Sequence, residues 1–235
     1  MDRSRPTPNR SSFRAVFSDS IALTMAIAGV AFAALAQTGT KEGTMNINIA
    51  AMAVGQPPRS FDSLLTGQGD VGTWLVVEDA TAETGRAIAQ VSRDRTDYRF
   101  PLAVYSEVSA PNVDVTVRFK PVAGEVDQAG GIAVRLSDAN NYYVVRANAL
   151  EDNVRFYRVV DGRRVQIKGA NVKVASGVWH TLGLRAEGEW FTIACDGKPL
   201  YTVEDKTFAG AGKVALWTKA DSVTHFDKLA ISNPR

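Results

Sequence analysis

The sequence predicts an all-β fold, an antiparallel sandwich or barrel, from three observations. Apolar and polar residues alternate with a period of two along almost every stretch after Phe61. The pairs Asp161-Gly162 and Asp196-Gly197 stand between β-rich stretches, and Asp-Gly favours the tight hairpin turn in which both central residues take positive φ. No stretch after residue 37 carries a sustained apolar stripe of helical period. Short strands without crossover helices pair with their neighbours in antiparallel fashion.

The expected strands are short, and turn-forming Gly, Pro, Asp and Asn residues separate them. Residues 60–65 come first and have the apolar spacing of a single helical turn. The strand at 113–121 is clearly marked, because every second residue from Val113 to Phe119 is apolar. In chain order, strands are expected at 73–78, 86–91, 102–106, 113–121, 131–137, 141–149, 153–160, 164–168, 179–186, 190–195, 200–204, 212–219 and 223–232.

Length and composition favour one domain with a substantial core. The chain has 235 residues, of which 45% are hydrophobic and 22% charged. Its formal charge of +2 arises within residues 1–36, which hold four Arg against two Asp, so the remainder is neutral. A neutral domain has little to gain from releasing the counterions of a nucleic acid. We therefore expect no nucleic-acid partner.

The first 36 residues have the pattern of a secretory signal peptide. A positively charged start is followed by an apolar stretch at 21–36, and Ala34-Leu35-Ala36 precedes Gln37 as a small-residue cleavage site. We expect a signal peptide at 1–36, a linker or N-terminal strap at 37–58 and a β-sandwich domain at 59–235. An uncleaved membrane anchor is the alternative for the leader. With cleavage, the protein is expected to be secreted or periplasmic and not inserted in a membrane.

Cys195 is the only cysteine, so an exported chain has no internal disulfide. It follows Phe191 and Ile193 at strand spacing, which favours a small buried hydrophobe over a reactive thiol. Stability is therefore expected to come from core packing.

Alternation assigns the strands two faces. In 131–137 it points Ile132, Val134 and Leu136 into the core and Arg135 outward. In 141–149 it separates apolar Val145 from a set that includes Arg146 and Asn148. The residues expected on this second, outward face are Arg135, Arg146 and Asn148. Arg155 joins them if Val154 and Phe156 are core.

Trp217 is expected to share its face with Lys219, because Val214 and Leu216 alternate with it. A Trp on a polar face is a platform on which a sugar ring can stack. The alternative is a Trp covered by a loop or by the N-terminal strap.

Several spaced motifs together resemble the concanavalin A-like lectin/glucanase superfamily, and within it the laminin G-like secreted bacterial domains labelled 3-keto-disaccharide hydrolase-like or family 16 glycoside hydrolase-like. The resemblance covers about residues 59–232 and implies a jelly-roll sandwich of two antiparallel sheets with a glycan or substrate on the concave face. The motifs are G-G-x-x-x-R at 130–135, N-Y-Y-x-x-R at 141–146, Asn153 with Gly162, "WHTLGL" at 179–184, "CDGK" at 195–198 and "KVALWTKADSVTHFD" at 213–227.

The catalytic pattern of family 16 hydrolases, E-x-D-x-x-E on one strand, is not met. Glu125 and Asp127 begin such a pattern, but Ala129 and Gly130 stand where the last acid belongs. We interpret both acids as solvated loop residues. His180 and His225 lack a G-x-S-x-G elbow or zinc-ligand spacing and are interpreted as structural.

No cofactor is expected apart from a structural calcium ion, which laminin G-like sandwiches often hold. The candidate oxygen ligands are Asp79, Asp221 and Asp227, although they form no loop motif such as D-x-D-x-D-G.

The sequence is compatible with three functions. The first is an exported carbohydrate-binding domain whose partner is a glycan or oligosaccharide, held on the concave sheet face. The second is a glycoside or 3-keto-sugar hydrolase with acids drawn from Glu151, Asp152 or Asp221, and the third is a structural envelope domain without a small ligand. The candidate ligand-binding residues are Arg135, Arg146, Asn148, Arg155, Trp217 and Lys219.

Overall fold

The computed structural model describes residues 43–234, so the predicted signal peptide at 1–36 lies outside the described residues. Within that range a 3-10 helix, η1, is the helical element and every other element is a strand. The elements are β1 (Met45–Asn46), η1 (Ile49–Ala51), β2 (Phe61–Gly67), β3 (Trp74–Glu78), β4 (Arg86–Gln90), β5 (Arg99–Ala110), β6 (Val113–Ala123), β7 (Ala129–Asp138), β8 (Asn141–Asn148), β9 (Asn153–Val160), β10 (Arg163–Asn171), β11 (His180–Glu187), β12 (Trp190–Cys195), β13 (Lys198–Glu204), β14 (Gly212–Trp217) and β15 (Val223–Ser232).

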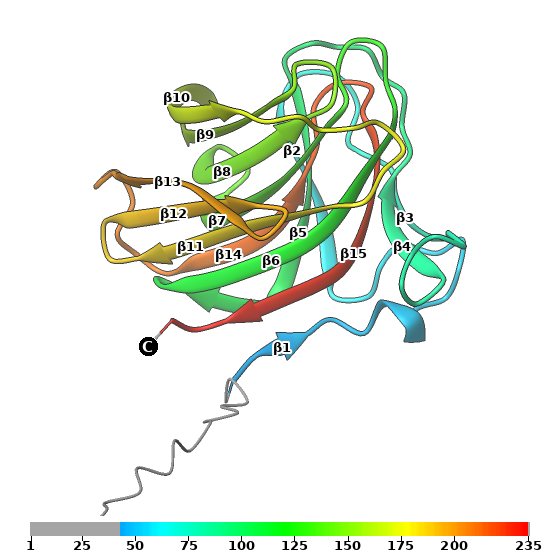
Figure 1. The fold of residues 1–235 in the computed structure, drawn as a ribbon, viewed down its shortest axis with the longest axis horizontal. Coiled ribbons are helices and arrows are strands. Elements are labelled where there is room, and N and C mark those ends of the chain that lie inside the picture. The colour runs from blue at the N-terminus through cyan, green and yellow to red at the C-terminus, as the bar shows by residue number, and fades with distance from the viewer. Residues whose placement is uncertain (1–42, 235) are drawn as a thin grey trace, which may run out of the picture. The chain divides into compact units, whose positions relative to one another are not determined.

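The strands form two antiparallel sheets that face each other as layers (Figure 1). Sheet A has the order β13-β12-β11-β6-β15-β4-β3, and β1 pairs with β15 beside this path. Sheet B has the order β10-β9-β8-β7-β14-β5-β2. The predicted sandwich of two antiparallel sheets is thereby confirmed, and both Asp-Gly pairs lie in turns between paired strands.

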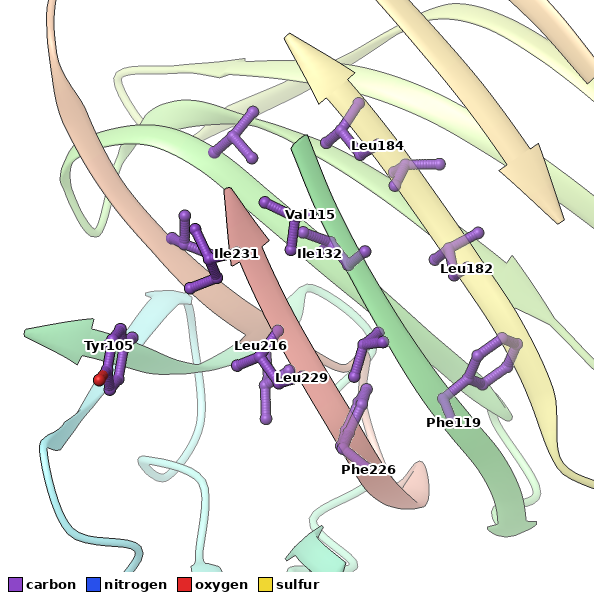
Figure 2. Packing of buried hydrophobic residues seen from close by; sticks show 14 of the residues in the cluster. Tyr105, Val115, Phe119, Ile132, Leu182, Leu184, Leu216, Phe226, Leu229 and Ile231 are labelled. Carbon is purple, nitrogen blue, oxygen red and sulfur yellow. The ribbon is translucent and has the colours of Figure 1, made fainter. Parts of the chain in front are cut away.

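The main core lies between the sheets and follows the predicted alternation. Figure 2 shows Val115 of β6 and Leu184 of β11, from sheet A, packed among residues that include Ile132 and Leu216 of sheet B. All four side chains are fully buried. Each large apolar side chain removed from water contributes about 1.5 to 3 kcal/mol before the entropy of ordering the chain is subtracted.

Sheet B is apolar on its outer face as well. Phe100, Leu102, Tyr142, Val144 and Trp217 belong to a second buried cluster, separate from the core between the sheets. A sheet with one face on the core and the other in water usually alternates apolar and polar residues. The second cluster therefore indicates that part of the outer face of sheet B is covered by the chain itself.

Residues 61–67 form a strand, so the expected helical turn at 60–65 is wrong. β2 pairs along its whole length with β5, from Phe61 opposite Tyr105 to Gly67 opposite Arg99. Leu64 packs against the outer cluster of sheet B. The apolar spacing of the segment resembles that of a helix, and its pairing partner lies far downstream, where local periodicity gives no signal.

The segment before β2 lies along sheet A. Met45 pairs with Ile231 of β15, and Ile49 and Met52 are buried in the main core. Arg86 fixes this segment by donating from Nη1 to the carbonyl oxygens of Ala50, at 2.6 Å, and Met52, at 2.8 Å. Among residues 43–234, no helix has the length and apolarity needed to cross a bilayer.

Candidate functional site

A transverse row on the outer face of sheet B brings three of the predicted residues together. Trp217 of β14 is paired with Gly131 of β7, Gly131 with Arg146 of β8, and Arg146 with Arg155 of β9. Cross-strand partners in a ladder point to the same face. Gly131 keeps the row open, because a Cβ there would lie 3.2 Å from Cβ of Arg146 and 3.3 Å from Cε3 of Trp217.

Arg146 is the centre of a polar network on this face. Its Nη1 donates to Oδ1 of Asn153, and its Nη2 donates to Oε2 of Glu151 at 2.8 Å and to the hydroxyl of Tyr157 at 3.2 Å. Arg146 is buried, whereas the Glu151 side chain is 48% exposed. Partial burial acts to raise the pKa of Glu151, but the hydrogen bond from Asn153 and the charge of Arg146 lower it below its usual value. Glu151 therefore offers an ionised, accessible acceptor.

Asn148 and Lys219, next to this network on the same face, both contact the carboxylate of Asp127. Asn148 Nδ2 donates to Oδ1 of Asp127 at 2.6 Å, and Lys219 Nζ lies 3.0 Å from its Oδ2. Lys219 also pairs with the exposed Asp97 at 2.6 Å. Four of the six predicted residues, Arg146, Asn148, Arg155 and Lys219, thus lie within one polar region beside Trp217.

Asp127 is buried, so its interpretation as a solvated loop acid is wrong. It is 2% exposed, and burial raises its pKa despite the opposing charge of Lys219. The cause is a loop fold that the sequence does not show. The backbone N–H groups of Glu125, Val126 and Asp127 all donate to the carboxylate of Asp221, which ties this loop to the connection between β14 and β15.

Trp217 lies on the expected face but has no exposed surface. It stacks on Phe100 with ring centroids 5.3 Å apart and planes 17° apart. The guanidinium carbon of Arg164 lies 5.7 Å from its ring centroid. The expected open stacking platform is therefore wrong: the cover is Arg164 of β10, the strand at the edge of sheet B, and not the N-terminal strap.

Arg135 does not belong to this face, which corrects the expectation that it points outward. Its φ of 51° breaks the alternation of β7, and the pairing register shifts there. The guanidinium instead donates to three loop carbonyls, those of Pro111 at 2.7 Å, Phe208 at 2.6 Å and Gly188. Leu136, expected in the main core, is consequently in the outer cluster of sheet B.

Arg155 lies at the end of the row, on the outward face as the burial of Val154 and Phe156 required. Its side chain extends over Gly169, where a Cβ would lie 2.3 Å from Cδ of Arg155. Its Nη2 donates to Oδ1 of Asn171 at 3.1 Å. The missing side chain at Gly169 therefore provides the space that Arg155 occupies.

Sequence reasoning missed Arg164 and Tyr157. Arg164 is paired with Val159, which places it on the face of Tyr157 rather than in the core. Alternation in β9 does place Tyr157 beside Arg155, so that signal was present in the sequence. No local signal placed Arg164 over the aromatic rings, because that contact depends on the curvature of the sheet edge.

The three acids considered for hydrolysis do not have the raised pKa of a general acid. Lys173 and the backbone N–H of Val174 lower the pKa of Asp152. Burial acts to raise the pKa of Asp221, but hydrogen bonds from backbone N–H groups lower it. The pKa of Glu151 is also lowered, as described above.

The three carboxylates considered for calcium do not come together. Asp79 is held by Lys120 at 2.5 Å and by His225 at 2.7 Å, and Asp227 accepts from Arg118 at 3.2 Å. Asp221 binds backbone N–H groups, as described above. Carboxylates surrounded by donors do not fit a cation site. Across residues 43–234, no group of three or more His, Cys, Asp or Glu side chains is arranged to hold a metal ion.

Both histidines have structural partners, and the cysteine is buried. His180 Nδ1 lies 2.8 Å from Oδ2 of Asp196, and its Nε2 accepts from the backbone N–H of Ala175 at 3.0 Å. His225 pairs with Asp79 at 2.7 Å. Cys195 is buried, and burial raises the pKa of its thiol to about 11, which keeps it protonated at neutral pH.

A hollow of about 490 Å³ lies on the outer face of sheet A, between the segment around β1 and the strands β6, β11 and β15. It is lined by Asn46, Arg118, Asp227 and Lys228, among others, and by none of the predicted site residues. Arg118 and Asp227 neutralise each other at 3.2 Å. This hollow is an alternative location for a ligand-binding site, besides the outer face of sheet B.

A scan against family models matched residues 100–234 to the family described as galactocerebrosidase, C-terminal lectin domain. That range begins in β5 and includes the whole of β6 to β15, and therefore all of the row from Trp217 to Arg155. No curated protein matched the chain.

Several solved structures share the fold. The carbohydrate-binding module CBM66 from Bacillus subtilis is 21% identical with a TM-score of 0.57, covering 74% of this chain and 98% of that chain. A β-glucanase from Bacillus licheniformis is 12% identical with a TM-score of 0.52, covering 83% of this chain and 100% of that chain. A Bacillus subtilis protein with a galectin-like fold is 10% identical with a TM-score of 0.52, covering 73% and 89%. The expected concanavalin A-like jelly roll is confirmed, and at these identities the likeness concerns the fold.

Proposed function

The chain belongs to the family of the galactocerebrosidase C-terminal lectin domain, and on that premise we propose that it is an exported domain that binds a glycan on the outer face of sheet B. The observation that carries this proposal is the polar network around Arg146, which lies beside buried aromatic rings and holds the half-exposed carboxylate of Glu151. We take this face to be the concave one expected for the fold.

A sugar hydroxyl both donates and accepts hydrogen bonds, so a site that binds several of them needs both kinds of group in fixed positions. Glu151 supplies an exposed carboxylate, and Lys219, whose side chain is 16% exposed, supplies a donor. Arg146 and Asp127 hold these two side chains in place from beneath. Groups held in this way lose little conformational freedom when a ligand binds.

The names of similar proteins support the same function. The matched family is described as a lectin domain, and one solved structure of similar fold is described as a carbohydrate-binding module. The three acids that the hydrolase alternative relies on are not favoured as general acids, because the pKa values of Glu151, Asp152 and Asp221 are all lowered. Export rests on the predicted signal peptide at 1–36.

The test is a glycan-array screen of residues 37–235, followed by titration of the best ligand against Glu151→Gln and Glu187→Gln. Glu187 is a matched control, because it forms the same kind of Arg–Glu pair, with Arg185 at 2.7 Å, on sheet A. We expect Glu151→Gln to weaken binding at least tenfold and Glu187→Gln to leave it unchanged. Lys228→Ala probes the hollow on sheet A. The proposal fails if no glycan binds, or if Lys228→Ala weakens binding and Glu151→Gln does not.

A further inference from the structure

Arg164 differs from the other cations on the outer face of sheet B. Arg146 is paired with Glu151, Lys219 with Asp97 and Asp127, and Arg155 donates to Asn171. The Arg164 side chain has neither a hydrogen bond nor an ion pair with any other residue in 43–234, and its Nη1 is a buried donor without a protein acceptor. Buried donors are nearly always paired, so an unpaired guanidinium calls for an explanation.

Aromatic rings hold the guanidinium in position without using its donors. Its central carbon lies 4.5 Å from the ring centroid of Tyr157, 4.6 Å from that of Phe100 and 5.7 Å from that of Trp217. A ring attracts the flat face of a guanidinium, whereas the N–H groups point outward in its plane. Arg164 is partly exposed. It therefore presents a positioned cation with unused donors at the edge of the proposed site.

Positive charge is concentrated around Tyr157. The guanidinium of Arg146 lies 5.8 Å from the same ring centroid as that of Arg164. Glu151 neutralises Arg146. Asp97 is close enough to Arg164 for their charges to interact, but its hydrogen bond is with Lys219. Counted over the whole face, the acids Glu151, Asp97 and Asp127 are outnumbered by the cations, which are Arg146, Arg155, Arg164 and Lys219. An excess of one cation next to a polar binding face favours a ligand with a negative charge.

Resting on the proposed glycan site, we propose that the ligand is an acidic glycan and that Arg164 binds the carboxylate of a uronic acid residue within it. Because Nη1 is buried, the two parallel donors left for a ligand are those of Nε and Nη2, and the two oxygens of a planar carboxylate can accept from both. A sulfated sugar carries the same sign of charge with a tetrahedral group and is an arm of the test. Arg164 would determine specificity, while Glu151 and Lys219 would contact hydroxyls common to many sugars.

The experiment is titration calorimetry of residues 37–235 with three matched sets of oligosaccharides: uronates (galacturonate, glucuronate and mannuronate oligomers), their methyl esters, and sulfated neutral oligomers of equal length. We expect at least one uronate to bind at least tenfold more tightly than its ester and than the sulfated oligomer. Arg164→Met, which keeps a long apolar cover over the rings, should abolish that difference and leave the affinity for the ester within about twofold. Arg164→Lys keeps the positive charge but loses the two parallel N–H donors, and it should retain only part of the difference in affinity between uronate and ester.

Arg163→Met is the matched control, because Arg163 is the preceding residue of β10 and points to the opposite face. It should change none of the affinities. Thermal unfolding of each variant separates a folding defect from a loss of binding. Equal affinity for uronates and esters, tighter binding of the sulfated oligomers, or binding confined to neutral glycans overturns the inference and leaves glycan binding intact. Absence of binding to every glycan overturns the proposed function itself.

Discussion

Arg164 lies over the ring of Trp217, with its guanidinium carbon 5.7 Å from the ring centroid, and Trp217 has no exposed surface. The relationship changes the role of the tryptophan. A ring that stacks on Phe100 and shares the guanidinium of Arg164 with it contributes apolar burial and a cation–π contact to the fold. A ligand on this face can therefore contact Arg164 but not the ring of Trp217.

Trp217→Ala is therefore expected to act on stability. Removing a fully buried aromatic side chain costs about 3 to 5 kcal/mol of unfolding free energy, because the transfer of the ring is lost and a cavity remains. Denaturant unfolding measures this loss. Trp190→Ala is the control, because Trp190 is 55% exposed and its loss should cost about 0.5 kcal/mol or less. A Trp217→Ala protein of unchanged stability and weakened glycan binding would contradict the structural role.

Arg135→Met should destabilise the fold without affecting glycan binding. The substitution removes the donor of three loop carbonyls, those of Pro111, Gly188 and Phe208, and keeps most of the volume. We expect a loss of about 1.5 to 3 kcal/mol, since the hydrogen bonds that are removed come from a charged and buried guanidinium. The measurements are denaturant unfolding and titration with the best glycan. Weakened binding by a fully folded variant would return Arg135 to the site.

The two arginines show how far periodicity carries a prediction. Arg146 lies in a regular strand, where a period of two assigned its face correctly and its pairing with Arg155 followed. Arg135 has positive φ at a register shift, and one such residue reverses the face of the residues after it. Nothing in "GIAVRLS" marks the shift, because Arg is not a residue that favours positive φ.

Long-range contacts account for the other differences between the structure and what the sequence predicts. β2 depends on pairing with β5, and the burial of Asp127 depends on Asp221, which lies far along the chain. Strand positions from β3 to β15 were predictable because their signals are local: alternation within strands and turn residues between them. The partners of buried polar side chains are set by the three-dimensional fold, and they decide which side chains of the site a ligand can reach.

Asp221→Asn is expected to lower stability at neutral pH but not in acid. The backbone N–H groups of Glu125, Val126 and Asp127 donate to the carboxylate, and these hydrogen bonds lower its pKa below 3.8 in the folded state, although burial opposes them. A lowered folded-state pKa adds stability above the unfolded-state pKa, and this contribution is lost as pH falls through the folded value. The variant should lose about 1 to 3 kcal/mol at pH 7, since charged hydrogen bonds are replaced by neutral ones.

Unfolding of Asp221→Asn and of the native protein is compared from pH 7 down to about pH 2, where the difference should shrink. Asp62→Asn, at an exposed position of β2, is the control and should show no such trend. A loss of the same size at both ends of the range would mean that the charge of Asp221 is not the cause.

Gly131→Ala tests whether the row from Trp217 to Arg155 needs an open position. A Cβ at residue 131 would lie 2.6 Å from the carbonyl oxygen of Val145, a backbone atom of the neighbouring strand that cannot rotate away. The strands β7 and β8 must therefore shift, and overpacking of this kind costs about 1 to 3 kcal/mol. Because Arg146 is on β8, its contacts with Glu151 should shift as well and weaken glycan binding. The control is Gly183→Ala on β11, where the nearest atom to a Cβ is 3.6 Å away. Denaturant unfolding and glycan titration of both variants provide the comparison, and equal behaviour of the two would show that the row tolerates a side chain at its centre.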